Sequence, residues 1–340
     1  MTLRIGIIGL GGIAQKVYLP LLGAAARWHL VGAFSPNQSR ARALCDSYRI
    51  PCFARIDELA QQCDALFVHS STESHFAVVS DLLKRGRHVY VDKPLAAALE
   101  QAEALLTLAA RQQRILMVGF NRRFAPLYQR LKQDMQHVAS LRMDKHRSDS
   151  VGPQDVRFTL LDDYLHVVDT ALWLAGGTLA LTGGVVWNNG TGQLLYAEHA
   201  FRCGEGLVTT AMHRQAGSQR ETVTAVTRGA LYRVEEMSRF QWERAGTLGE
   251  LPVPVWQTIL TQRGFTGAVE HFIDCAANQM QIPTYPISCS TLYTILCKCL
   301  FSEVTVQAVE AQEPVCPAAR SVQGDFVRRN DASGANSTHD

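Results

Sequence analysis

The chain has 340 residues, of which 47% are hydrophobic and 19% are charged, and its formal net charge is +2. This composition supports a sizeable core and argues against global disorder, and the length favours two domains. Without a basic run, an acidic tail or an apolar stretch long enough to span a bilayer, we expect no nucleic-acid or membrane partner and a cytoplasmic location.

The first residues predict a dinucleotide-binding turn. The apolar run Ile5–Ile8 is typical of a buried parallel strand, and a helix is expected over Gln15–Ala26. Between them, Gly9 permits a tight turn and Gly11 lets the backbone approach a pyrophosphate. The alternative is an ordinary strand–helix turn. The predicted cofactor-binding residues of this turn are Gly9, Gly11, Gly12, Ile13 and Ala14.

The end of the second predicted strand, His29–Phe34, bears on cofactor choice. An acidic residue at this position would bind a ribose 2′-hydroxyl and repel a 2′-phosphate, but the chain has Ser35, with Arg40 and Arg42 following. This favours NADP over NAD. The same segment is also suited to capping the helix predicted at Gln38–Tyr48, and both interpretations can hold together.

Three further strands alternate with helices such as Glu100–Gln112. The strands are predicted at Ala65–His69, His88–Val91 and Ile115–Gly119. Strand–helix alternation predicts an α/β fold with a doubly wound parallel sheet, in which ligands bind outside the carboxyl ends of the strands. The polar residues near these ends are candidate cofactor or substrate contacts: Ser70, Ser71, His75, Asp92, Lys93 and Asn121.

The pattern changes in the second half of the chain. An alternating strand is predicted at Ala139–His146, a helix at Phe158–Ala175 and another helix at about Gly264–Asn278. Between the helices lie strand-like segments at Gly184–Trp187, Leu194–Arg202, Leu207–His213, Glu221–Thr227 and Ala230–Glu235. Successive strands without helices predict an α+β domain with an open, mostly antiparallel sheet. We therefore expect a dinucleotide-binding domain at 1–122, a second domain at 123–313 and a disordered tail at 314–340.

Acidic residues and a histidine stand together in the helix predicted at Phe158–Ala175. Asp162 and His166 are four residues apart and share a face, with Asp169 close to it. With Lys93 they could form an acid/base group, although a solvated ion pair would give the same spacing. The nine cysteines are irregularly spaced, so we expect reduced thiols and no metal site.

Taken together, these motifs resemble the Gfo/Idh/MocA family of oxidoreductases. The resemblance rests on Gly9–Ala14, Asp92-Lys93-Pro94, Gly119–Phe124 and Asp162-x-x-x-His166-x-x-Asp169. Within the family, Met143–Ser148 and Gly217–Thr222 resemble the bacterial MviM-like branch, which is called a virulence factor.

The resemblance implies a Rossmann domain followed by an open sheet that often forms a homodimer. It also implies NAD(P)-dependent hydride transfer to or from a carbon of a sugar, polyol or sugar acid. In that chemistry Lys93 polarises the substrate oxygen, His166 is the acid/base and Asp162 orients the pair. The candidate substrate contacts are Asn121, Arg123, His146, Arg147 and Asp169. The arginines would suit an acidic or phosphorylated sugar, but they could equally pair with carboxylates.

The chain departs from the family pattern at three places. Asp92 replaces the usual glutamate, Ser35 replaces the usual acid, and the segment after about residue 285 is apolar and cysteine-rich where a polar helix is expected. We assign no function to that last segment. Two other functions stay open: a dinucleotide-binding sensor or scaffold without turnover, and a nicotinamide-assisted glycosidase.

Overall fold

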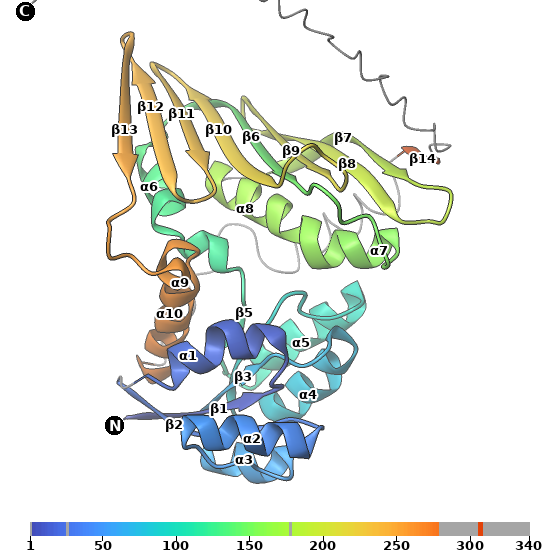
Figure 1. The fold of residues 1–340 in the computed structure, drawn as a ribbon, viewed down its shortest axis with the longest axis vertical. Helices are drawn as coiled ribbons and strands as arrows, with labels where there is room; N and C mark the ends of the chain where they lie inside the picture. The colour runs from blue at the N-terminus through green and yellow to red at the C-terminus, as the bar shows by residue number, and fades with distance from the viewer. Residues whose placement is uncertain (1, 25–26, 177–178, 279–304, 309–340) are drawn as a thin grey trace, which may run out of the picture. The chain divides into compact units, whose positions relative to one another are not determined.

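The structure is a computed structural model that describes residues 2–24, 27–176, 179–278 and 305–308. These residues lie in one compact unit that contains two β-sheets (Figure 1). The predicted tail at 314–340 and most of the apolar segment after residue 285 lie outside the described residues. No helix in the described part is long and apolar enough to cross a bilayer.

The first sheet is parallel, with the strand order β2-β1-β3-β4-β5. Its strands are β1 (Leu3–Ile8), β2 (Trp28–Phe34), β3 (Ala65–Val68), β4 (His88–Val91) and β5 (Leu116–Val118). The helical segments between them are η1 (Ala14–Tyr18), α1 (Leu19–Leu22), α2 (Gln38–Tyr48), α3 (Ile56–Gln62), α4 (Thr72–Lys84) and α5 (Leu99–Arg111). The predicted doubly wound sheet is confirmed. The order reverses between β1 and β3, where such sheets bind ligands.

The first helix is shorter than the sequence predicts. The sequence predicts a helix as far as Ala26, but α1 ends at Leu22 and is followed by a turn at Gly23. The indole N–H of Trp28 donates to the carbonyl oxygen of Leu22 at 3.0 Å. Trp28 is the first residue of β2. Its indole satisfies the Leu22 carbonyl at the end of α1, which would accept a backbone N–H if the helix were longer.

The second sheet is mixed but mostly antiparallel, as predicted, with the order β13-β12-β11-β10-β6-β9-β8-β7-β14. Its strands are β6 (Val138–His146), β7 (Leu179–Asn188), β8 (Leu194–Cys203), β9 (Gly206–His213), β10 (Arg220–Thr227), β11 (Ala230–Glu235), β12 (Arg239–Arg244), β13 (Thr247–Pro252) and β14 (Thr305–Ala308). Among the described strands of this sheet, only the β6–β9 and β7–β14 pairs are parallel. Strands β12 and β13 were not predicted, and β13 is largely exposed, so it lacks a buried apolar alternation.

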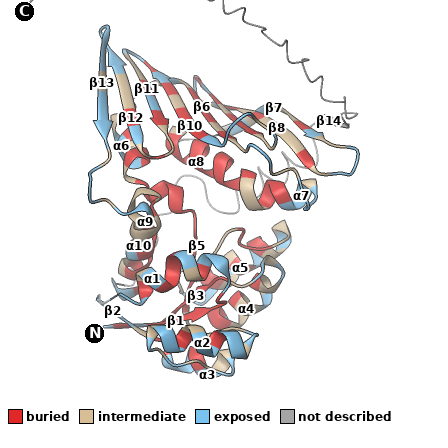
Figure 2. Cartoon of the chain, viewed as in Figure 1, coloured by how far each residue is buried: buried red, intermediate tan, exposed pale blue. Residues whose placement is uncertain are grey.

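Helices connect and cover the two sheets. They are η2 (Asn121–Phe124), α6 (Pro126–Asp134), α7 (Val156–Thr159), η3 (Leu160–Tyr164), α8 (Leu165–Ala175), α9 (Ile259–Gln262) and α10 (Phe265–Asn278). The segments α7, η3 and α8 follow one another without a break and form the helix predicted at Phe158–Ala175. Helix α8 packs against β6 and β9, and Figure 2 shows it almost wholly buried.

Helix α10 returns to the first sheet. Its Phe272 ring lies 5.2 Å from the ring of Phe67 and 5.6 Å from that of Tyr90, which belong to β3 and β4. The helix therefore packs on the first sheet, although it lies within residues 123–313, the range predicted as the second domain. Apolar residues at helical spacing predict that a helix is buried, but they do not say against which sheet.

Candidate functional site

The glycine turn has the backbone geometry that a dinucleotide needs. Gly9 has φ +91°, and a Cβ atom there would lie 2.6 Å from the backbone of His69 and Ser70. Only glycine fits this position, because both the conformation and the space exclude a side chain. At Gly11 and Gly12, in contrast, a Cβ would meet no atom within 4 Å. These two residues therefore leave an open backbone surface that a pyrophosphate could approach.

A pocket of about 380 Å³ lies at the carboxyl ends of β3 and β4. Its predicted members are Ile13, Ser70, Ser71, His75, Asp92, Lys93, Asn121, Asp162 and His166. The members that sequence reasoning missed are His69, Thr72, Glu73, Phe158 and Phe265. Thr72 and Glu73 belong to a polar stretch that already suggested a ligand site. No local signal could have identified Phe265, because it reaches the pocket only through the return of α10.

Lys93 and Asp162 form the central contact of this pocket. The ammonium group of Lys93 donates to the backbone carbonyl of Asp162 at 2.6 Å and to its Oδ1 at 2.7 Å. The lysine side chain is 17% exposed and the aspartate side chain 47%, so the pair can be reached from the pocket. These two hydrogen bonds, to a residue 69 positions away, hold the ammonium group in one place. A group that binds a substrate oxygen needs such a fixed position.

His166 lines the same pocket and is buried. Burial lowers the pKa of His166 well below its usual value, and the positive charges of Arg122, Lys93, Lys145 and Arg147 lower it further. The ring is therefore neutral at neutral pH and can accept a proton. Because it is buried, His166 does not belong to the solvated ion pair that the spacing alone would also allow.

Other predicted residues brace the strand ends. The His75 ring nitrogens lie 2.8 Å from the carbonyl oxygen of Pro94 and 3.0 Å from that of Ser70. Asn121 donates to the carbonyl oxygen of Arg263 at 2.7 Å. These polar groups hold the loops of the pocket together. His75, which is predicted as a cofactor contact, lines the pocket, and backbone carbonyl groups engage both of its ring nitrogens.

Asp92 lies directly before Lys93. It accepts a hydrogen bond from the backbone N–H of Lys93 at 2.8 Å. Burial raises the pKa of its carboxyl group, although the neighbouring lysine opposes that rise. Asp92 therefore stabilises the turn at the end of β4 and lines the pocket.

Four predicted substrate contacts have other partners. Arg123 and Asp169 form a buried ion pair, with Arg123 Nε 3.0 Å from Asp169 Oδ2. Arg147 binds Asp163, and His146 Nδ1 accepts the backbone N–H of His213 at 3.1 Å. None of the four is among the residues that line the pocket. Both arginines therefore bind carboxylates, which is the alternative that the sequence left open.

The residues predicted to choose between NADP and NAD lie outside the pocket. Asn37 caps α2 by accepting the backbone N–H of Arg40 at 3.2 Å, as the capping interpretation predicts. The side chains of Arg40 and Arg42 are exposed, and Ser35 is partly exposed. The cap therefore exists, and it leaves the side chains of these residues available to a ligand.

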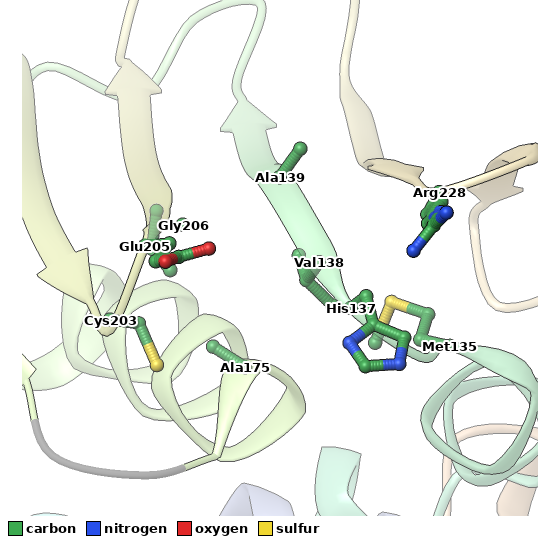
Figure 3. A pocket seen from close by; sticks show the side chains of 10 residues that line it. Met135, His137, Val138, Ala139, Ala175, Cys203, Glu205, Gly206 and Arg228 are labelled. Atoms are coloured by element: carbon green, nitrogen blue, oxygen red, sulfur yellow. The ribbon is translucent and has the colours of Figure 1, made fainter.

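A larger hollow of about 630 Å³ lies elsewhere, at the start of β6 and the β8–β9 turn. In Figure 3 the ionisable residues His137 and Arg228 lie apart from Glu205 instead of converging on one point. It contains none of the predicted site residues. Among the described residues no group of His, Cys, Asp or Glu side chains is arranged to hold a metal ion. The pocket with Lys93 is therefore the candidate active site.

Comparison with known proteins identifies the family of the chain. Residues 3–120 match the family model of the oxidoreductase family with an NAD-binding Rossmann fold, and residues 126–245 match that of the YceM-like C-terminal domain. The chain is 59% identical over 278 residues to "Putative oxidoreductase YceM" of Salmonella typhimurium, which covers 82% of this chain and 91% of that protein.

A solved structure and a more distant relative extend the comparison. The crystal structure of a dehydrogenase (MviM) from Clostridium difficile matches with a TM-score of 0.86 and 38% identity, over 88% of this chain and 99% of that one. The UDP-N-acetylglucosamine 3-dehydrogenase of Acidithiobacillus ferrooxidans is 29% identical over 179 residues, 51% of this chain and 55% of that protein.

Proposed function

The chain belongs to the Gfo/Idh/MocA family of oxidoreductases, and on this premise we propose that it is an NAD(P)-dependent enzyme. It moves a hydride to or from a hydroxyl-bearing carbon of a sugar, polyol or sugar acid. The observation that carries the proposal is the Lys93–Asp162 pair, which faces the same pocket as the neutral His166. Three such groups at the carboxyl end of a parallel sheet suit the oxidation of an alcohol.

The residues present fit a dinucleotide. The bare backbone at Gly11 and Gly12 would hold the pyrophosphate, and Ser70 and Ser71 supply hydroxyl groups at the adjacent strand end. When bound, the nicotinamide ring would supply or accept the hydride. The role of the protein is then to hold the substrate carbon and to manage the hydroxyl proton.

The three polar residues divide that work. His166 accepts the hydroxyl proton in the oxidative direction, because its ring is neutral. Lys93 stabilises the negative charge that develops on the oxygen, and Asp162 keeps the ammonium group in place. In the reductive direction the same groups return the proton.

A substrate panel tests the proposed activity. Purified protein is incubated with sugars, polyols and sugar acids while NAD(P)H absorbance is followed, and at least one compound is expected to change it. His166→Ala and Lys93→Ala are the matched controls that should lose the signal. Release of an aglycone without net cofactor reduction would identify a glycosidase instead. Tight cofactor binding with no turnover of any compound would identify a sensor.

We propose a preference for NADP(H), supported by Ser35 and the exposed arginines at 40 and 42. Calorimetry should show tighter binding of NADPH than of NADH, and Ser35→Asp should reverse the order. Gly11→Val should weaken both, because the added side chain meets no protein atom but occupies the space for the pyrophosphate. Equal binding by Gly11→Val and the parent would place the cofactor elsewhere.

We also propose that the second sheet forms a homodimer. Apolar side chains that are at least partly exposed on its strands support this: Trp187, Leu207, Val226, Leu248 and Leu251. Exposed apolar groups on one sheet are a common feature of protein interfaces. Light scattering should give twice the monomer mass, and Leu207→Glu with Val226→Glu should reduce it. A monomeric parent protein would reject the proposal.

A further inference from the structure

A cluster of ion pairs lies beside the candidate active site. Asp163 follows Asp162 in the η3 turn, and its carboxylate accepts hydrogen bonds from Lys145, Arg147 and Arg214. Lys145 belongs to β6, Arg147 follows that strand directly, and Arg214 follows β9. The Asp163 side chain is only 13% exposed. Its contacts therefore tie the turn to two strands of the second sheet.

The two neighbouring aspartates bind in different directions. Asp162 holds the ammonium group of Lys93 through both its carbonyl and its carboxylate, while Asp163 binds the cations of the second sheet. Successive residues of a helical turn point in different directions, so one turn can serve both sides. Because the carbonyl of Asp162 belongs to the same short turn, moving Asp163 would also move the group that positions Lys93.

The cluster also supplies charge near His166. Arg122, Lys145 and Arg147 all act on the ring, and each is held by a carboxylate of the second domain. Arg122 binds Glu221 at 2.8 and 2.7 Å. Burial lowers the pKa of Lys145 to about 8, with Arg122 acting in the same direction, so this lysine still carries its charge at neutral pH.

Several other ionisable groups surround His166. The pocket that it lines also contains His69, Glu73, His75, Asp92, Lys93 and Asp162. Behind it, α8 and η2 contribute the buried Arg123–Asp169 pair. The acidic members offset part of the positive charge, and each cation of the cluster is held in place by a carboxylate.

We infer that Asp163 and its three cationic partners are positioning residues for the proposed reaction. They fix the turn that presents Asp162 to Lys93, and their positive charge adds to the effect of burial in opposing protonation of the His166 ring. This inference rests on the proposed function. The Met143–Ser148 segment, which resembles the MviM-like branch, thereby gains a role at the site through Lys145 and Arg147.

The test removes one charge while leaving Asp163 paired. Lys145→Met takes away a cation, Arg147 and Arg214 still bind the carboxylate, and Lys145→Arg restores the charge. Lys84→Met, at an exposed position at the end of α4, is the matched control. The ring resonances of His166 are followed by NMR from pH 8 down to the lowest pH at which the protein stays folded, and they are assigned by their absence in His166→Gln. Thermal unfolding verifies that each variant is folded.

We expect Lys145→Met to shift the titration of His166 to higher pH, because a less positive environment favours the protonated ring. With an active substrate, kcat/KM at the acid end of the profile should fall by roughly three- to tenfold, as for the loss of one partly screened charge. Lys145→Arg and Lys84→Met should match the parent. If Lys145→Met equals the parent in both measurements, the inference is rejected. The NMR measurement needs no turnover, so it stands even if no substrate is found.

Discussion

One helical run, residues 156–175, contains Asp162 and Asp169, and the ion pairs that these two aspartates form with Lys93 and Arg123 lie in different surroundings. The Lys93–Asp162 pair opens to the pocket, with side-chain exposures of 17% and 47%. The Arg123–Asp169 pair is closed off, with exposures of 8% and 1%. Both acids are aspartates of one helical run, whereas the pairs differ in their cation, a lysine or an arginine, and in their burial.

This difference indicates which pair can act on a substrate. A carboxylate that can reach solvent can exchange partners when a ligand binds, and the lysine it holds is available to a substrate oxygen. A buried pair cannot change partners without exposing a charge to the protein interior, which is costly. We therefore expect loss of the first pair to affect activity and loss of the second to affect stability.

The largest expected effect is on turnover. His166→Ala and Lys93→Ala should each lower kcat by about 10²–10⁴, the usual contribution of an acid/base group, while cofactor affinity and the melting temperature stay near those of the parent. Because the groups act together, the double variant should be much less than multiplicatively worse. Steady-state kinetics and calorimetry measure these effects. A His166→Ala protein that turns over at the parent rate from about pH 6 to 9 would exclude His166 as the acid/base.

The second effect is on stability, and here we expect the larger loss for the buried Arg123–Asp169 pair instead of the Lys93–Asp162 pair. Asp169→Asn removes the charge of the buried carboxylate that binds the Arg123 guanidinium, so the free energy of unfolding should fall by about 3–5 kcal/mol. The same change at Asp162 should cost about 1 kcal/mol or less, because the pair is partly exposed. Urea denaturation of the two variants makes the comparison within one helical run. Equal losses would show that burial does not separate the pairs.

A third effect is the pH dependence of a second buried pair, Arg122–Glu221. Burial alone would raise the pKa of Glu221, but Arg122, Lys145 and Tyr128 lower it to about 2. Since this is below the ordinary value of 4.5, the ionised carboxylate stabilises the fold at neutral pH, and that contribution is lost as the pH falls from 4.5 towards 2. Denaturation at several pH values should show this fall in the parent and a smaller fall in Glu221→Gln. Identical slopes would mean that Glu221 does not titrate in this range.

Much of the first domain could be predicted from the sequence. The strand–glycine–helix order at residues 5–14 and the β–α alternation are local patterns, and they were sufficient for the parallel sheet and for the position of the pocket. Lys93, Asp162 and His166 were selected by motif and spacing, and the structure brings all three to one pocket. Their catalytic roles remain predictions.

The partners of the charged residues could not be predicted in the same way. His166 and Asp169 are three residues apart, so spacing placed both near the pocket, but Asp169 turns inward to Arg123. The contacts of Asp163 depend on which strands lie beside η3, and strand order is a property of the whole sheet. The same limit applies to α10, whose apolar face gave no information about its partner sheet.

We expect the smallest effect on stability from an ion pair at the protein surface. Arg130 and Asp134 form an i,i+4 pair on α6 with Nε 2.9 Å from Oδ2, and the arginine side chain is 54% exposed. Water already solvates the guanidinium, so Arg130→Gln should change the free energy of unfolding by about 0.5 kcal/mol or less, and added salt should reduce even that difference. Urea denaturation at low and high salt measures it beside Asp169→Asn. If Arg130→Gln cost as much as the buried variant, the contribution of an ion pair in this protein would depend on something other than its burial.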